Sequence, residues 1–411
     1  MRLRYLITGG AGFLGINLCR HLLAQNHQVR SLDVAPFQAP ERPRVEVING
    51  DIRHPEIVDN TRTGAPAEAA AKIAFLSDPS SYPDRPSRVM VIETHFAWVF
   101  LAGARAYKLK KATHLRGADW RTPQAREHAC REELQLNRQI SALTYLGVEP
   151  LVRAAVGFRI GGEGATVDWL LVMRRLDERR MLEALLTADT LIPADLDAIL
   201  QFLVNFYKSR PPLPFTPETY LRRVAERMEE SLRALEHPRA ALERTDIERV
   251  AGVLRATFAS LKSQLGDRAA RHHIVEGHGD LRAEHVWLGP PVQIIDALEV
   301  YADLRMLDTA EEIAMLALEC ERHGVDWAAT YLRGRYRALA ADQCSDDLFE
   351  FYMALRAINQ AKLAIWHLDD PEQYPQATRW RERARHAIAG ALRHWSKGAL
   401  LSPGGRGTSP G

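Results

Sequence analysis

The spacing of apolar and polar residues changes along this chain, and the change predicts two kinds of structure. Residues 88–93, 97–101 and 104–110 alternate or run apolar between turn residues, which predicts three short β-strands. From residue 177 onward, apolar residues recur at helical spacing. The helices expected in this part are 194–208, 217–235, 240–265, 309–323, 326–341, 346–368 and 373–396. The pattern as a whole predicts an α+β protein.

The first residues have a pattern of their own. A short apolar strand at 3–8 is followed by a glycine-rich turn at 9–15, and a helical pattern then runs through Leu18, Leu22 and Leu23. A second strand, 27–33, ends in an acidic residue. Glycines between a strand and a helix allow the backbone to approach a pyrophosphate at the helix N-terminus. This start therefore predicts a βαβ unit of the dinucleotide-binding type.

This segment, 1–58, resembles the NAD-dependent epimerase/dehydratase (extended short-chain dehydrogenase) family, through Thr8–Gly15 and its T-G-x-x-G-x-x-G pattern. The resemblance implies that Gly9, Gly12 and Gly15 approach the pyrophosphate of NAD and that Asp33 bonds the ribose. After residue 58 no further alternating strands and helices follow, so the unit is expected to be a partial Rossmann fold. NAD binding and a fusion remnant without a role both stay open.

Composition narrows the class of protein. The chain has 411 residues, 46% of them hydrophobic and 26% charged, with a net charge of +2, which is typical of a globular protein and does not favour a nucleic-acid partner. No apolar run approaches the roughly 20 residues of a membrane helix, so no membrane association is expected. The four cysteines lie far apart, which favours packed, reduced thiols in a cytoplasmic protein.

One charged turn carries the candidate chemistry. It reads His278-Gly279-Asp280-Leu281-Arg282-Ala283-Glu284-His285 and is followed by an apolar run, 292–295, that ends at Asp296. With Asp280 on the loop and Asp296 after the next strand, two carboxylates approach one pocket. One can accept a proton from a hydroxyl while the other holds a divalent metal, as phosphoryl transfer requires.

These residues resemble the H-G-D-L-x-x-x-N loop and I-D strand of the aminoglycoside phosphotransferase-like kinases, a resemblance that spans about 66–396. It implies a bilobal protein-kinase-like fold, with a small mixed β lobe and a large helical lobe, that uses ATP and Mg²⁺ to phosphorylate a hydroxyl of a small molecule. Asp280 would be the catalytic base, Arg282 would neutralise phosphoryl charge, and Asp296 would bind Mg²⁺. His285 replaces the expected Asn, so it either acts through a water or leaves the metal to Asp296 and phosphate.

The same resemblance assigns residues in the predicted strands. Ala106-Tyr107-Lys108 occupies the place of the A-x-K strand motif, so Lys108 would bind nucleotide phosphates, with Glu133 on the helix at 126–141 holding it. Lys110 is expected on the same face of the strand. Asp308 resembles an aspartate that braces the catalytic loop. Arg356 and Lys362 could face an anionic substrate, although charged residues exposed on a helix surface are the more ordinary interpretation.

The expected organisation is a partial Rossmann unit at 1–58, a linker at 59–68, a kinase-like small lobe at 69–176, a helical lobe with the catalytic loop at 177–400 and a disordered tail at 401–411. Two other interpretations stay open. One is a non-catalytic nucleotide-binding or scaffold protein, which the absence of a glycine-rich loop in the small lobe favours. The other is an NAD-linked function of residues 1–58. The sequence identifies neither the substrate nor the oligomeric state.

Overall fold

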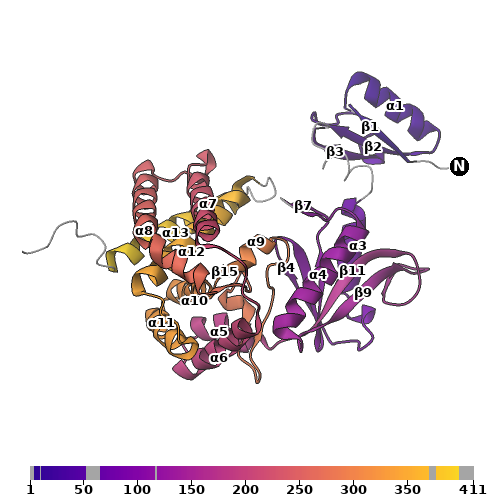
Figure 1. Ribbon diagram of the computed structural model, residues 1–411. Helices are drawn as coiled ribbons and strands as arrows, with labels where there is room; N and C mark the ends of the chain where they lie inside the picture. Colours follow the sequence, from indigo (N-terminus) through magenta and orange to yellow (C-terminus); the bar gives the residue numbers. More distant parts are fainter. Residues whose placement is uncertain (1–3, 10, 52–64, 116–117, 370–375, 398–411) are drawn as a thin grey trace, which may run out of the picture. The chain divides into compact units, whose positions relative to one another are not determined.

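The computed structural model describes residues 4–9, 11–51, 65–115, 118–369 and 376–397 (Figure 1). The chain divides into two compact units. The sheet unit comprises Met1–Arg131 and Leu146–Arg175, and the helical unit comprises Glu132–Tyr145 and Leu176–Gly411. Of the expected linker, only 65–68 are described, at the start of a helix, and the expected tail lies outside the described residues.

Residues 4–49 form a parallel βαβ arrangement, as the glycine pattern predicts. Strands β1 (Arg4–Thr8), β2 (Gln28–Asp33) and β3 (Val45–Asn49) pair in parallel in the order β1-β2-β3. Helix α1 (Phe13–Ala24) follows β1, and the short 3₁₀ helix η1 (Arg42–Arg44) precedes β3. Among the described residues no strand pairs with the other edge of β1, so the unit is half of a doubly wound sheet.

The buried face of α1 differs from the expected one. Cys19, Leu22 and Leu23 pack against the strands, whereas Leu18 is 47% exposed and Leu14 is 81% exposed. A helix beside a complete sheet of this kind normally buries a wider apolar stripe. The exposed leucines therefore lie on the side of α1 that the half sheet does not cover.

The sheet unit contains a six-stranded sheet in the order β10-β9-β11-β6-β5-β4. Its strands are β4 (Val89–Glu93), β5 (Ala97–Ala102), β6 (Arg105–Lys110), β9 (Tyr145–Arg153), β10 (Phe158–Ile160) and β11 (Thr166–Arg174). The other elements are α3 (Ala65–Ser77), η2 (Pro79–Ser81), the ribbon β7 (His114–Leu115) and β8 (Ala118–Asp119), and the first half of α4 (Pro123–Ser141), whose residues from Glu132 onward belong to the helical unit. The three predicted strands are confirmed as β4, β5 and β6.

A buried charged cluster ties the helices of the sheet unit to β11. The Arg126 guanidinium donates to both carboxylate oxygens of Asp168, at 2.7 and 2.8 Å, and the Lys72 ammonium donates to the same carboxylate at 2.9 Å. All three side chains are buried. Because an unpaired buried charge costs several kcal/mol, roughly 3–5 when one partner is removed, this cluster fixes α3 and the start of α4 against the sheet.

The helical unit is built from long helices and four short strands. Its helices are η3 (Glu178–Arg180), α5 (Leu182–Thr187), α6 (Pro193–Ser209), α7 (Pro217–Leu235), η4 (Pro238–Ala240), α8 (Arg244–Ala270), η5 (Ala283–His285), α9 (Ala302–Arg305), α10 (Thr309–Arg322), α11 (Asp326–Ala340), α12 (Asp346–Trp366), η6 (His367–Asp369) and α13 (Ala377–Lys397). Its strands are β12 (Ile274–Glu276), β13 (Val286–Trp287), β14 (Gln293–Ile294) and β15 (Met306–Asp308). The predicted α+β class is confirmed.

Helix α10 is the centre of this unit. Every residue from Thr309 to Cys320 is buried, and α11 and α12 pack against it. A helix that is buried all round belongs to the core rather than to the surface. Among the described residues, no helix has the length and apolar character needed to cross a membrane. The four cysteines are buried, as expected of packed thiols.

Candidate functional site

The loop 278–285 connects β12 to β13 in the helical unit. β12 pairs with β15, and β13 pairs with β14, so both ends of the loop are fixed by strand pairing. Gly279 has φ +86°, and a Cβ at this position would lie 3.0 Å from Arg305 Cγ and 3.3 Å from the Leu304 carbonyl oxygen. Only glycine fits both the left-handed backbone and the crowding, which explains the glycine of the H-G-D motif.

His278 links the two halves of the site. Its Nδ1 accepts a hydrogen bond from the Asp280 backbone N–H at 3.3 Å, so Nε2 carries the proton and donates to the Ile295 carbonyl at 2.8 Å. Burial lowers the pKa of His278, which keeps the imidazole neutral and preserves this tautomer. The ring thereby connects the backbone of Asp280 to the residue before Asp296.

His285 lies between the two predicted carboxylates. Its Nδ1–H donates to the Asp280 carbonyl oxygen at 2.8 Å and lies 3.8 Å from Asp280 Oδ2. Its Nε2 lies 3.7 Å from Asp296 Oδ2. The structure therefore brings Asp280, His285 and Asp296 together, as the sequence predicts for the loop and the I-D strand.

The backbone of Asp296 is unusual. It has φ +62°, a left-handed conformation that is uncommon for a residue with a side chain and that costs on the order of 1–3 kcal/mol. Its N–H donates to the Tyr145 hydroxyl at 2.8 Å, and the next N–H, of Ala297, donates to Asn137 Oδ1 at 2.9 Å. These two bonds hold the backbone in a conformation that aims the carboxylate at His285.

Polar residues of α4 that the sequence interpretation missed hold this segment. Ser141 Oγ donates to the Ile294 carbonyl at 2.6 Å and accepts from the Ile294 N–H at 2.8 Å. Glu133, Asn137 and Ser141 recur at every fourth position and are all buried. A stripe of polar residues at helical spacing inside a buried helix is a signal that could have identified Asn137 and Ser141 beside Glu133, which the sequence analysis did name.

The side chain that braces the loop 278–285 is Glu312 and not Asp308, which corrects the sequence prediction. The Glu312 carboxylate accepts the backbone N–H groups of His278 at 3.1 Å and Gly279 at 2.6 Å, together with the Tyr207 hydroxyl at 2.7 Å. Asp308 instead caps α10 through the Ala310 N–H and accepts Arg268 in a buried ion pair. Asp308 comes before the first turn of α10, whereas Glu312 lies one turn further along, where its side chain reaches the loop.

Arg282 is paired within the loop. Its guanidinium lies 2.6 Å from Glu284 Oε1, and the side chain is 31% exposed. Burial lowers the pKa of Arg282, but the nearby carboxylates of Asp280 and Glu284 outweigh burial and raise the pKa overall. Arg282 is therefore a fixed positive charge beside Asp280.

Arg356 and Lys362 are not exposed surface charges, which was the ordinary interpretation of them. Both are buried, and their cationic groups lie 2.8 Å from Glu311 and 3.1 Å from Glu230, respectively. Arg356 Nη1 also donates to the Gly279 carbonyl at 3.4 Å. Burial raises the pKa of Glu311, but Arg227 and Arg356 outweigh it and hold that pKa at about 2. Arg356 thus contacts the loop through the Gly279 carbonyl, and its ion pair with the ionised Glu311 keeps its guanidinium in place.

Lys108 and Lys110 lie on the same face of β6, as predicted. Tyr107 and Leu109 enter the core of the sheet unit, so the two lysines point to the opposite face. Lys108 is partly buried, whereas Lys110 is only 2% exposed, with its ammonium 4.4 Å from the centre of the Trp120 ring. Glu133 is fully buried. The predicted pairing of Lys108 with Glu133 stays a prediction.

The glycine residues of the parallel segment surround the start of α1. Gly9 follows β1 with φ +70°, Gly12 is the N-cap of α1, and Gly15 is buried in its first turn. Asp33 Oδ2 accepts the Ala11 N–H at 3.0 Å. The predicted phosphate loop and its acidic residue are therefore adjacent.

The donors available to a metal are Asp296 Oδ2 and His285 Nε2, with Asp280 on the other side of the ring. The described residues contain no cluster of three or more His, Cys, Asp or Glu side chains poised around one ion. A Mg²⁺-type nucleotide site needs only one or two protein carboxylates, because phosphates and waters complete the coordination. The residues present fit such an ion with a mixed oxygen and nitrogen donor pair.

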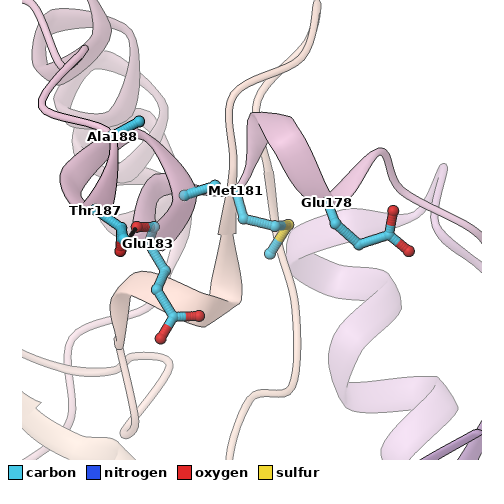
Figure 2. A pocket seen from close by; sticks show the side chains of 6 residues that line it. Glu178, Met181, Glu183, Thr187 and Ala188 are labelled. Atoms are coloured by element: carbon cyan, nitrogen blue, oxygen red, sulfur yellow. Dashed lines mark hydrogen bonds between the residues drawn. The ribbon is translucent and has the colours of Figure 1, made fainter.

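A hollow of about 480 Å³ lies close to the loop, lined by Glu178, Met181, Glu183, Ala184, Thr187 and Ala188 (Figure 2). Met181, which lines the hollow, makes a β-bridge to Trp287 of β13, the strand that follows the loop. Trp287 Nε1 also donates a hydrogen bond to the Asp177 carbonyl oxygen. The lining of the hollow includes two acidic side chains, Glu178 and Glu183, but not Asp280 or Asp296.

Comparison with known sequences gives two separate likenesses. Residues 5–137 match the model of the NAD dependent epimerase/dehydratase family. An uncharacterised protein of Mycobacterium tuberculosis is 32% identical over 308 residues, which are 74% of this chain and 58% of that protein. This chain therefore spans about 58% of the length of these relatives. A 3β-hydroxysteroid dehydrogenase/Δ5→4-isomerase of M. tuberculosis is 50% identical over 54 residues, 13% of this chain and 15% of that protein.

Among solved structures, a choline/ethanolamine kinase family protein of Mesorhizobium loti has a TM-score of 0.48 at 13% identity, covering 81% of this chain and 96% of its own. The GDP complex of aminoglycoside 2'-phosphotransferase-IIIa has a TM-score of 0.47 at 13% identity, covering 78% and 98%. The solved structures similar to this chain are thus aminoglycoside phosphotransferases and choline/ethanolamine kinases, and its first part matches the NAD dependent epimerase/dehydratase family.

Proposed function

We propose that this protein is an ATP-dependent phosphotransferase that acts on a hydroxyl of a small molecule. The observation that carries the proposal is the placement of His285 between the carboxylates of Asp280 and Asp296, at 3.8 and 3.7 Å. One carboxylate on a loop and one after a strand, fixed opposite each other, meet the two needs of phosphoryl transfer: a proton acceptor and a metal ligand.

In the proposed mechanism, Asp280 takes the proton of the acceptor hydroxyl while the hydroxyl oxygen bonds to the γ-phosphorus of ATP. The bond from phosphorus to the bridging oxygen breaks, and its electron pair leaves with ADP. Arg282 would offset negative charge on the transferred group, and the family resemblance assigns Lys108 to the nucleotide phosphates and Glu133 to holding that lysine. Asp296 and His285 would hold a divalent cation, which would neutralise part of the negative charge of the nucleotide phosphates. Most of the acceleration would come from positioning and electrostatics.

A thermal-shift titration with Mg–ATP tests this proposal against a non-catalytic scaffold of the same fold. A ligand at about 100 times its Kd stabilises the folded state by about 2.7 kcal/mol, so we expect the melting temperature to rise by several degrees. We expect a chelator, or the variant Asp296→Asn, to remove most of that rise. A rise that neither change affects would favour the scaffold. A screen of metabolites for ATP-dependent phosphorylation would then identify the acceptor.

A second candidate function is dinucleotide binding by residues 4–51, favoured by the adjacency of Gly9, Gly12 and Asp33 around the start of α1. NADH fluorescence tests it. In the wild type we expect saturable binding if the half sheet is sufficient, and Gly12→Val should weaken it at least about tenfold, because the added side chain occupies the place of the pyrophosphate. If NADH binds neither protein, dinucleotide binding by this segment is excluded.

A further inference from the structure

The His285 imidazole differs chemically from the asparagine side chain expected at this position. One ring nitrogen, Nδ1, makes a hydrogen bond, and the other, Nε2, can bind a metal. The residue is 8% exposed, and Nδ1–H is used by the Asp280 carbonyl at 2.8 Å. In the neutral ring Nε2 therefore carries a lone pair. Within the described residues Nε2 has no hydrogen-bond partner, since the nearest carboxylates are too far away.

The available nitrogen faces two carboxylates. Asp296 Oδ2 lies 3.7 Å from Nε2, and Glu284 Oε1 lies 3.8 Å from it. Two donors that bind one cation at about 2.1 Å and at right angles to each other are about 3 Å apart. A movement of less than about 1 Å would therefore let Nε2 and Asp296 share an ion. Glu284 also pairs with Arg282 at 2.6 Å, whereas the backbone hydrogen bonds at Asp296 and Ala297 aim the Asp296 carboxylate at His285.

We propose that His285 gives this site a preference for first-row transition-metal dications over Mg²⁺, with Nε2 and Asp296 as the two protein ligands. The inference rests on the proposed function, because the phosphates of a bound nucleotide complete the coordination. Mg²⁺ prefers oxygen ligands, whereas imidazole nitrogen suits transition metals, whose affinity rises from Mn²⁺ to Co²⁺. An asparagine at position 285 would offer oxygen only and would remove the advantage of these metals.

The test is calorimetric titration of Mg²⁺, Mn²⁺ and Co²⁺ into the full chain in the presence of a non-hydrolysable ATP analogue, corrected for each metal's affinity for the analogue alone. For the wild type we expect Mn²⁺ and Co²⁺ to bind at least about tenfold more tightly than Mg²⁺, with Co²⁺ the tightest. In His285→Asn we expect this preference to fall to about threefold or less while Mg²⁺ still binds. The visible absorption of Co²⁺ should also change, because a nitrogen ligand is lost.

His386→Asn, an exposed histidine of α13, is the matched control and should leave the metal preference unchanged. His285→Gln, which also offers a carbonyl oxygen, replaces the Asn variant if that protein does not fold. If the analogue binds with Mg²⁺ as tightly as with Mn²⁺ or Co²⁺, and the His285 variant changes nothing, this inference is wrong while the proposed function stands. If the analogue binds with none of the three metals, both are wrong.

Discussion

Asp280→Ala is expected to lower ATP-dependent phosphoryl transfer by about 10²–10⁴-fold, the usual contribution of a positioned general base. This corresponds to about 3–5 kcal/mol of transition-state stabilisation. The side chain is the proposed proton acceptor, whereas the loop around it is held by the main chain. The Asp280 N–H donates to His278 and its carbonyl accepts from His285, so the loop should keep its shape in the variant.

The measurement is transfer of labelled phosphate from ATP, followed together with a thermal melt of each variant. Asp280→Asn keeps the shape of the side chain without its basicity and should be nearly as inactive as the alanine variant. Asp246→Asn, an exposed aspartate of α8, removes the same charge far along the chain and should keep full activity. ATP turnover at the wild-type rate in a folded Asp280→Ala protein would exclude Asp280 as the base.

The helices of the second half were predictable because each carries its apolar residues at a spacing of three or four. In α6, Leu196, Ile199, Leu200, Leu203 and Val204 are all buried, as their spacing predicts. Local chemistry also fixes the ends: α7 begins at Thr216-Pro217, where the Thr216 side chain accepts the Thr219 N–H. Such signals lie within one turn of the chain and do not depend on the rest of the fold.

Strands β9 and β10 were not predicted, because their own residues lack the alternating pattern of a strand. β9 contains Gly147 and Pro150, which interrupt the alternation that marks a strand, and its burial does not alternate. β10 has only three residues, Phe158–Ile160. On α1, Cys19 is buried and Leu18 is exposed. This difference does not follow from local sequence, because it depends on which face of the helix the strands cover.

Some residues of the candidate site were likewise predictable from local sequence, whereas others depend on contacts with distant elements. The loop at 278–285 and Asp296 could be found because their residue types and spacing are local. Glu312 and Tyr145 could not, because they reach the loop and the Asp296 segment from distant elements through backbone hydrogen bonds that any sequence would offer there. Asp308 was assigned the bracing role by its resemblance to a family aspartate, but Glu312, one turn further along α10, is the side chain that reaches the loop.

The residues that position the carboxylates therefore form two separate supports. Tyr145, Asn137 and Ser141 hold the segment that carries Asp296, and Glu312 holds the N-terminal side of the loop that carries Asp280. His278 joins the two supports through its two ring nitrogens. Since catalysis by positioning loses about 100-fold for a displacement near 1 Å, a change at either support should affect activity without touching a substrate.

Glu312→Ala is expected to show this effect most strongly, with a loss of stability of about 2–6 kcal/mol and a fall in kcat of about 100-fold. The carboxylate is fully buried and accepts two backbone N–H groups of the loop, of His278 and Gly279. Without it, both donors stay buried and unsatisfied, each at a cost of about 1–3 kcal/mol, unless the loop moves to find water. Movement of the loop displaces Asp280 and lowers kcat, while the KM for ATP should change little.

Two variants separate positioning from general loss of stability. Glu319→Gln changes a buried glutamate on the same helix that pairs with Arg322 and Gln360, and it should cost stability without lowering kcat at a temperature where the protein is folded. Tyr207→Phe removes only the hydroxyl bond to Glu312 and should have a small effect on kcat. Glu312→Gln keeps one acceptor oxygen and should restore part of the rate. If Glu312→Ala melts earlier but retains wild-type kcat when folded, Glu312 stabilises the core and does not position Asp280.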